Sequence, residues 1–376
     1  MSLSLPADPP QTRSLTGVVP QLLDSLTGAS DWFAPARSAV VLLVDGLGRG
    51  NLTARAGHAR FLVSSMAKRD AARTVFPSTT ASALTSLLTG EAPGVHGIVG
   101  YRVRIPGTDA APNQLKGWET AGLDPHAWQR GAPLLERAAA EGRPCFVVSD
   151  ARYARTGFTE AILRGGAFVA GATTAERVEI AADLAARHPG ALVYAYTSDL
   201  DVVGHAHGWE SDAWAAALER VDDAARLLEQ ALPADVGAVV TADHGMVDVP
   251  RHRQLLIGEG DPLWDGVRIV AGEPRMLHLY ADEPVAVLDR WRAAEQSRSW
   301  VLSRDEAVAA GLFGARVDPE VAPRIGDVLV AARADVAYYD DRLADKKSQR
   351  MIGQHGSLTD RERIVPLIRL GAYRSR

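Results

Sequence analysis

Four short runs of apolar, largely β-branched residues recur along the chain, and longer segments rich in alanine and leucine separate them. The apolar runs occupy residues 38–44, 144–149, 191–197 and 237–242. The separating segments include residues 173–188 and 210–232, where apolar residues recur at helical spacing. Strands that are apolar on both faces and alternate with helices are typical of a parallel sheet buried between two helical layers. The pattern therefore predicts an α/β fold, with a mainly parallel central sheet flanked by helices on both faces.

Three segments interrupt this alternation. Residues 1–14 contain three prolines among small polar residues, which is typical of a flexible N-terminal arm. Residues 101–140 and about 262–350 lack the regular periodicity. We expect both to be inserted cap segments on the main sheet, because the motif at residues 353–356 indicates a return to the core. Residues 15–376 are thus predicted to form a single domain.

Composition and charge narrow the function classes. The 376 residues carry a net charge of −5, with acidic and basic residues interspersed, so no basic face is expected that would bind a nucleic-acid polymer. No apolar run approaches the roughly 18 residues that a membrane span requires, and the N-terminus does not resemble a secretory signal. We expect a soluble, cytoplasmic protein that does not bind membranes. Nothing in the sequence indicates the oligomeric state.

Acidic and histidine side chains follow several of the predicted strands directly. Ligands of open parallel sheets bind beyond the carboxyl ends of the strands, so residues there are the first candidates for chemistry. Adjacent side chains on a strand point to opposite faces, so Asp243 and His244 can reach one point only if the chain turns. Asp201 and His205 share one face if they lie on a helical turn. The full set of candidate ligands is Asp45, Asp201, His205, Asp243, His244 and His355.

This set of aspartates and histidines predicts a metal site. Mixed carboxylate and imidazole ligands suit Zn²⁺, Mn²⁺ or Fe, whereas Ca²⁺ prefers oxygen ligands alone. The set exceeds what one four-coordinate zinc ion uses, so two ions are the simpler interpretation. Single residues have ordinary alternatives: Asp45 could cap the following helix, and His355 could be a loop histidine.

Residues 74–90 offer a nucleophile. Ser78, Thr79 and Thr80 precede a helical pattern that ends at Gly90. A hydroxyl at a helix N-terminus lies where free backbone N–H groups and the helix dipole favour an anion such as phosphate. A metal ion nearby would lower the pKa of that hydroxyl. The same residues are also good N-caps, and spacing alone does not choose among the three.

The order and spacing of these motifs resemble those of the alkaline phosphatase superfamily, and specifically of its nucleotide pyrophosphatase/phosphodiesterase branch. That branch combines a first-strand Asp, a Thr in a VFPTKT-like segment ten residues before a Gly, a D-x-x-x-H motif, an Asp-His-Gly and a C-terminal His between glycines. The resemblance covers the ordered motifs from Asp45 to His355, which is most of the chain. It also selects Thr80, within VFPSTT, over its neighbours.

The resemblance implies an alkaline phosphatase-like catalytic domain with two divalent ions, usually zinc in that family. One ion would be held by Asp45, Asp243 and His244 and would touch Thr80, and the second would be held by Asp201, His205 and His355. The implied activity is that of a two-metal phosphohydrolase that cleaves phosphodiester or pyrophosphate bonds of small nucleotide-type substrates. The reaction would pass through a covalent phospho-threonine intermediate.

One position departs from the family pattern. The Asn that follows HGI in the family, and whose amide helps to hold a phosphoryl oxygen, is replaced here by Tyr101. The Tyr101 hydroxyl, or the neighbouring Arg102 or Arg104, could donate an equivalent hydrogen bond to the substrate. The alternatives within the superfamily are a phosphomonoesterase and a phosphonate hydrolase. The alternative of another class is a non-catalytic metal- or nucleotide-binding protein.

Overall fold

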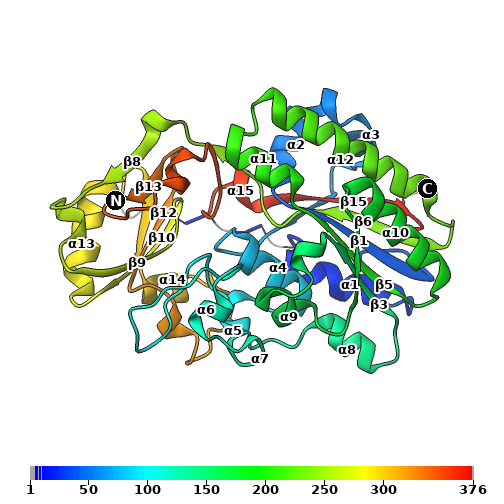
Figure 1. Ribbon diagram of the computed structural model, residues 1–376, viewed down its shortest axis with the longest axis horizontal. Helices are drawn as coiled ribbons and strands as arrows, with labels where there is room; N and C mark the ends of the chain where they lie inside the picture. The colour runs from blue at the N-terminus through cyan, green and yellow to red at the C-terminus, as the bar shows by residue number, and fades with distance from the viewer. Residues whose placement is uncertain (1–4, 7, 10, 375–376) are drawn as a thin grey trace.

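The central sheet confirms the predicted α/β architecture (Figure 1). The structure is a computed structural model that describes residues 5–6, 8–9 and 11–374. In order across the seven-stranded sheet, the strands are β2 (Ala71–Arg73), β15 (Ile364–Gly371), β6 (Val236–Thr241), β1 (Ser38–Val44), β5 (Leu192–Thr197), β3 (Cys145–Ser149) and β4 (Ala167–Ala170). The five strands from β6 to β4 run parallel, and β15 is antiparallel to both β6 and β2.

The four predicted apolar runs form the parallel core of this sheet. β1 lies between β5 and β6, and every one of its residues is buried. Val44 is level with Thr197 of β5, and Leu43 is level with Thr241 of β6. Because these three strands run parallel, the chain leaves all of them at the same edge of the sheet. Residues that follow β1, β5 and β6 are therefore brought together.

Helices cover both faces of the sheet, as predicted. Figure 1 shows α12 with α2 and α3 on one side, and α1, α4 and α9 on the other. The predicted helical segments form α10 and α12, and α12 begins where the Ser211 side chain accepts a hydrogen bond from the Trp214 N–H. The helices around the main sheet have the following bounds: α1 (Val18–Ser25), α2 (Arg49–Ala54), α3 (Arg60–Ser65), α4 (Thr80–Thr89), α8 (Leu134–Ala140), α9 (Gly157–Leu163), α10 (Thr174–Arg187), α11 (Asp199–His207) and α12 (Asp212–Ala231).

Much of the segment 262–350 forms a second, smaller sheet, drawn in yellow and orange beside the main one in Figure 1. Its antiparallel strands, in order, are β11 (Ser299–Ser303), β12 (Val328–Ala332), β10 (Met276–Ala281) and β9 (Val267–Glu273). Two helices, α13 (Pro284–Glu295) and α14 (Arg304–Ala309), pack against it. The small sheet has its own buried apolar cluster, which includes Leu279 and Trp291.

The other predicted insertion, residues 101–140, contains short helices that follow α5 (Pro93–His96): α6 (Trp118–Ala121), α7 (Pro125–Trp128) and α8. Two further strand pairs connect the small sheet to the core. They are β13 (Ala337–Asp340) with β8 (Gln254–Ile257), and β14 (Gly353–Gln354) with β7 (Val247–Asp248). A fully buried ion pair joins Arg275, in the β9–β10 turn, to Glu362 of α15 (Asp360–Arg363). The tip of this hairpin is thereby fixed against the main sheet.

The predicted N-terminal arm is described in part, because residues 1–4, 7 and 10 lie outside the described residues. The Arg73 N–H of β2 donates to the Arg13 carbonyl at 2.8 Å. The Arg363 guanidinium donates to both carboxylate oxygens of Asp8, at 3.0 and 2.8 Å. Of the helices described here, none combines the length and the apolar character needed to cross a membrane.

Candidate metal centre

The ends of β1, β5 and β6 bring acidic side chains to one place. Asp45 follows β1 directly, and α11, which carries Asp201, begins two residues after β5. Asp243 lies two residues beyond the end of β6. Its Oδ1 accepts a hydrogen bond from the Gly46 N–H at 3.1 Å, which ties the loop after β1 to the loop after β6. The parallel register of the strands thus assembles the aspartates that the sequence places far apart.

The chain turns at Asp243 and His244, so that both side chains face Asp45. His244 Nε2 lies 3.4 Å from Asp45 Oδ1 and 3.4 Å from Asp243 Oδ2. The side chains of all three residues are almost completely buried. Gly245 allows the loop after His244 to pass close to α15 (Asp360–Arg363), because a Cβ at this position would clash with the backbone oxygen of Arg361. The adjacent ligands therefore converge on one point, as the sequence requires of a metal site.

A second group surrounds His355. Asp201 and His205 lie four residues apart on α11, with His205 Nε2 3.4 Å from Asp201 Oδ1. His355 follows β14, and its Nε2 lies 3.3 Å from His205 Nε2. The His355 ring also stacks on the His244 ring, with 3.6 Å between centroids. The six candidate ligands consequently form one continuous cluster.

The hydrogen bonds of the three histidines show which ring nitrogen of each is available to a metal ion. Each Nδ1 lies near a backbone carbonyl: that of His205 is 2.7 Å from the Gly353 oxygen, that of His244 is 3.1 Å from the Gly245 oxygen, and that of His355 is 3.0 Å from the Ser78 oxygen. A carbonyl only accepts, so each Nδ1 carries the proton and each Nε2 presents a lone pair. Those lone pairs face carboxylate oxygens and, between His205 and His355, each other. Cations at these positions would turn the opposed lone pairs into ligands.

Buried oxygen atoms without partners support the same interpretation. Asp45 Oδ1, Asp201 Oδ1 and Asp243 Oδ2 are buried and make no hydrogen bond within the described residues. The ligand atoms of Asp45, Asp243 and His244 all lie within 4.8 Å of one another, and so do those of Asp201, His244 and His355. His244 thus belongs to both groups. The residues present fit two divalent cations, and the division of the ligands between the two ions stays a prediction.

The electrostatics of the cluster agree with this fit. Burial raises the pKa of the Asp45 carboxyl well above its usual value, and the nearby carboxylates of Asp243 and Asp201 raise it further. Burial lowers the pKa of His355 well below its usual value, which keeps the imidazole neutral. A neutral imidazole offers a lone pair to a cation, and a divalent cation would relieve the repulsion among the closely spaced carboxylates that raises the pKa of Asp45.

The Thr80 hydroxyl is the one of the three candidate hydroxyls that contacts this cluster directly. Thr80 is the first residue of α4, and its Oγ1 lies 3.1 Å from His244 Nε2. Ser78 instead donates to the backbone oxygen of Ser357 at 2.7 Å. Thr79 takes the N-cap position, and its side chain lines the neighbouring cavity. The geometry distinguishes residues that their spacing in the sequence could not.

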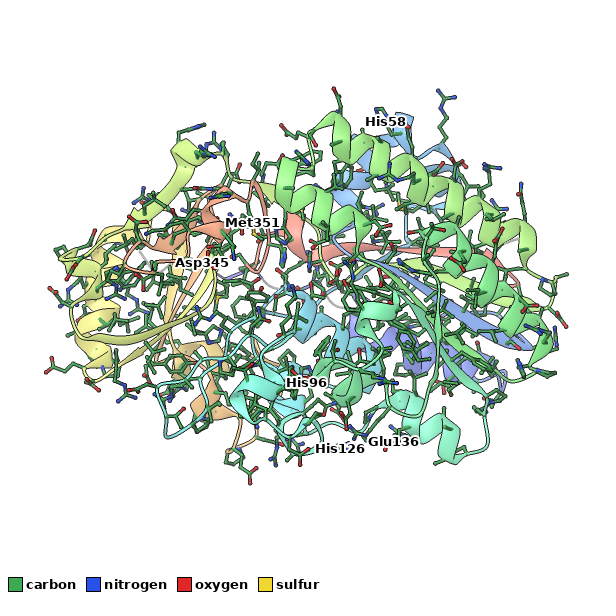
Figure 2. All side chains as sticks on the ribbon, viewed as in Figure 1. His58, His96, His126, Glu136, Asp345 and Met351 are labelled. Atoms are coloured by element: carbon green, nitrogen blue, oxygen red, sulfur yellow. The ribbon has the colours of Figure 1, made fainter. Side chains whose placement is uncertain are left out.

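A cavity of about 550 Å³ opens beside the cluster. Asp45, Thr80, Asp201, His205 and His355 form part of its wall. Figure 2 labels Met351, which also lines the cavity and lies where the small sheet meets the main one. The apolar part of the lining comes mainly from Leu84, Leu115, Phe158, Ile162, Leu163 and Phe168.

Of the three residues predicted to contact the substrate, one lines the cavity and two do not. Tyr101 lines the cavity. Arg102 and Arg104 are not among the described residues that line it: Arg102 donates to the Ala111 carbonyl at 3.2 Å, and the Arg104 guanidinium lies over the Tyr280 ring. The Arg and Lys residues that do line the cavity are Lys116 and Arg152, which the sequence analysis did not name. Arg152 follows the carboxyl end of β3 closely, so the strand-end argument could have found it.

The sequence analysis did not identify two further residues that lie at the candidate site. Tyr196, within the apolar run of β5, donates its hydroxyl proton to Asp45 Oδ2 at 2.5 Å. Glu273, at the end of β9, places its Oε2 3.5 Å from His355 Nδ1. Burial raises the pKa of the Glu273 carboxyl well above its usual value. Nothing in the sequence marks Glu273, because it reaches the site from the inserted sheet.

The fold and the clustered candidate ligands agree with the resemblance to the alkaline phosphatase superfamily. Within it, the sequence model described as type I phosphodiesterase / nucleotide pyrophosphatase matches residues 39–358, and the chain belongs to that family. Membership supports a hydrolase that acts on phosphate esters. A comparison with curated protein sequences found no match.

Solved structures share this fold at low sequence identity. Murine ectonucleotide pyrophosphatase / phosphodiesterase 5 aligns with a TM-score of 0.68 and 17% identity, over 88% of this chain and 87% of that one. An inactive Thr-to-Ala variant of the same mouse protein, in complex with AMP, aligns with a TM-score of 0.69 and 16% identity, over 89% and 88%. Phosphonoacetate hydrolase from Sinorhizobium meliloti 1021, in complex with phosphonoformate, aligns with a TM-score of 0.66 and 18% identity, over 90% and 91%.

Proposed function

We propose that this protein is a metal-dependent phosphohydrolase that cleaves phosphodiester or pyrophosphate bonds of small, nucleotide-type substrates, with Thr80 as the nucleophile. The observation that carries the proposal is the position of the Thr80 hydroxyl. It lies at the N-terminus of α4, in contact with His244 and on the wall of a cavity next to the other candidate ligands. A non-catalytic metal-binding protein would not need a hydroxyl at this point.

The six aspartates and histidines of the cluster would hold two ions, which we propose to be Zn²⁺. The nitrogen and oxygen donors suit zinc, and the expected division is Asp45, Asp243 and His244 for one ion and Asp201, His205 and His355 for the other. When bound, such ions neutralise charge on phosphoryl oxygens and on the leaving oxygen, and they lower the pKa of a neighbouring hydroxyl.

The residues of the chain position the phosphoryl group for attack. The first backbone N–H groups of α4 have no partner within the helix, and the positive end of the helix dipole lies there, so a phosphoryl group is favoured beside Thr80. Attack forms a bond between Thr80 Oγ1 and phosphorus, the hydroxyl proton passes to solvent, and the bond to the leaving oxygen breaks with its electron pair going to that oxygen. Water then attacks the same phosphorus, its oxygen joins the product, and Thr80 Oγ1 leaves and regains a proton.

The cavity supports a substrate with a flat or apolar portion. Phe158 and Phe168 offer aromatic surface in its wall, and Tyr153 lies near the rim beside the exposed Arg152. A nucleobase or an aryl group could pack against the rings, while Arg152 and Lys116 could bind a second anionic group. AMP bound to the murine structural relative is a ligand of this general shape.

The nucleophile can be tested with Thr80→Ala and Thr80→Ser. We expect Thr80→Ala to abolish zinc-dependent release of p-nitrophenol from p-nitrophenyl thymidine monophosphate, with zinc content unchanged by elemental analysis. Thr80→Ser should keep measurable turnover, and Thr53→Ala, at an exposed threonine of α2, should match the wild type. Full activity in Thr80→Ala would refute the assignment. Absence of any zinc-dependent release from the wild type would favour the non-catalytic alternative.

A phosphonate hydrolase is the second candidate. It is favoured by the shared fold of the Sinorhizobium phosphonoacetate hydrolase and by the two cationic side chains on the cavity wall, which could bind a substrate carboxylate. Phosphate release from phosphonoacetate, compared with p-nitrophenol release from the thymidine diester, ranks the two candidates. If the protein cleaves phosphonoacetate faster than the thymidine diester, phosphonate hydrolysis replaces the first proposal.

A further inference from the structure

Glu273 is held in the cavity wall by specific features of the fold. It lies at the tip of the β9–β10 hairpin, two residues before Arg275, whose buried guanidinium donates to both carboxylate oxygens of Glu362 at 2.8 and 2.9 Å. Gly356, next to His355, makes room for it, because a Cβ there would lie 2.6 Å from Glu273 Cδ. The backbone of Gly356 also has a φ of +122°, which favours glycine.

No structural partner accounts for the Glu273 carboxylate. Its side chain is 6% exposed, and no Lys or Arg of the described residues forms an ion pair with it. Its Oε2 lies 3.5 Å from His355 Nδ1, but the proton of that nitrogen is already directed at the Ser78 carbonyl at 3.0 Å. Its Oε1 makes no well-formed hydrogen bond within the described residues, although the Thr79 hydroxyl lies beside the carboxyl group. Burying such a group costs stability, so a role in the cavity is the better explanation.

We propose that Glu273 is a specificity-determining residue, whose negative charge disfavours dianionic phosphoryl groups and so selects monoanionic diesters over monoesters and phosphonates. This inference rests on the proposed phosphohydrolase function. Glu273 and the proposed nucleophile Thr80 line the same cavity, so a phosphoryl group under attack would face the Glu273 side chain. Burial raises the pKa of the Glu273 carboxyl, and two divalent cations in the adjacent cluster would oppose that shift and favour the ionised carboxylate. The three aspartates would leave these cations with one net positive charge, which the Glu273 carboxylate would cancel. The loaded site then offers no excess positive charge for the second negative charge of a monoester.

The size of the effect follows from Coulomb's law. Two unit charges that face each other across one cavity, at an effective dielectric constant between those of protein and water, change relative binding by on the order of tenfold per additional charge. Removing the charge of Glu273 should therefore favour the dianion over the monoanion by about this factor.

The test uses zinc-loaded full-length protein and two substrates with the same leaving group. We expect Glu273→Gln to raise the ratio of kcat/KM for p-nitrophenyl phosphate to that for p-nitrophenyl thymidine monophosphate by on the order of tenfold. Glu273→Asp keeps the charge and should stay near the wild-type ratio. Glu259→Gln, which removes an exposed carboxylate that does not line the cavity, is the control and should leave the ratio unchanged.

A binding measurement gives a second readout that does not depend on turnover. Inorganic phosphate, which is largely dianionic at pH 8, should bind zinc-loaded Glu273→Gln more tightly than the wild type by a similar factor in titration calorimetry. If Glu273→Gln does not fold, Glu273→Met carries the same prediction at a similar side-chain volume. The proposal would be overturned if Glu273→Gln left both the substrate ratio and the phosphate affinity unchanged. It would also be overturned if Glu273→Gln lowered kcat/KM equally for both substrates and Glu273→Asp restored it. A wild type that hydrolyses neither substrate would count against the proposed function, whereas phosphate affinity would still test Glu273.

Discussion

Replacing Asp243 with asparagine should stabilise the metal-free protein and, at the same time, abolish its stabilisation by zinc. In the metal-free cluster, the Asp45 and Asp243 carboxylates are buried within 4.8 Å of one another. The lone pair of His244 Nε2 faces both, at 3.4 Å from each. Asp243→Asn keeps an oxygen to accept the Gly46 and His244 N–H groups, which now donate to Oδ1 at 3.1 and 3.0 Å. The amide nitrogen takes the place of Oδ2 and donates to His244 Nε2.

The magnitude can be worked from these distances. Two unit charges about 4.8 Å apart repel by roughly 3.5 kcal/mol at an effective dielectric constant of 20. The raised pKa of Asp45 shows that protonation already relieves part of this repulsion, so we expect a gain of about 2 kcal/mol in the free energy of unfolding. Zinc at a hundred times its Kd would stabilise the wild type by roughly 2.7 kcal/mol and the variant by far less.

The assay is thermal and urea unfolding at pH 8, where an ordinary histidine is neutral, once with EDTA and once with zinc. The order of stability should reverse between the two conditions, with Asp243→Asn more stable in EDTA and the wild type more stable in zinc. Asp289→Asn, at an exposed carboxylate of α13, is the control and should show no reversal. If Asp243→Asn is the less stable protein in EDTA, the inferred repulsion between the carboxylates does not exist.

Three further predictions concern the scaffold. Burial lowers the pKa of His96, labelled in Figure 2, to about 3, so as pH falls below about 6.5 the unfolded chain takes up a proton at this histidine before the folded protein does. The free energy of unfolding should then fall by up to roughly 1.4 kcal/mol per pH unit. The difference between the urea midpoints at pH 7 and pH 4.5 should therefore be smaller in His96→Gln than in the wild type. Gly356→Ala should lower the free energy of unfolding by at least about 2 kcal/mol in urea, because alanine is strained at a φ of +122° and its Cβ would clash with the Glu273 side chain. Gly142→Ala should lower it by less, because Gly142 also has a positive φ but has open space around it. Arg275→Met and Glu362→Gln should each cost about 3–5 kcal/mol, whereas the double variant should cost much less than their sum in a double-mutant cycle.

The elements and ligands that follow local rules could be predicted from the sequence. The run at residues 38–44 is apolar throughout because β1 is buried on both faces, and its period and composition require no tertiary knowledge. Asp45 and Asp243 could be named as candidate ligands because parallel strands end at one edge of the sheet, and the structure brings them together there. The helical turn that aligns Asp201 with His205 also exists, as part of α11.

Other contacts depend on the path of the inserted segments, which no local pattern encodes. Arg102 was proposed because it neighbours Tyr101 in sequence, yet its guanidinium binds the Ala111 carbonyl instead of lining the cavity. Neighbours in an extended segment point in different directions, so closeness in sequence did not predict a shared site. Glu273 is separated by more than eighty residues from His355, and only the hairpin and its anchoring ion pair bring them together.

The candidate site therefore has two parts, one built by the ends of the main strands and one built by other segments. The candidate ligands at the strand ends are fixed by the register of the main sheet, so changing one of them should affect metal binding and chemistry together. Glu273, Lys116 and Arg152 reach the cavity from outside these three strands. Changes at such positions can alter the charge and shape presented to a substrate while the ligand cluster stays intact. Discrimination among phosphate esters in this fold is therefore expected to depend more on the cavity wall than on the ions. Glu273→Gln should keep the zinc content of the wild type at saturating zinc while its substrate ratio changes.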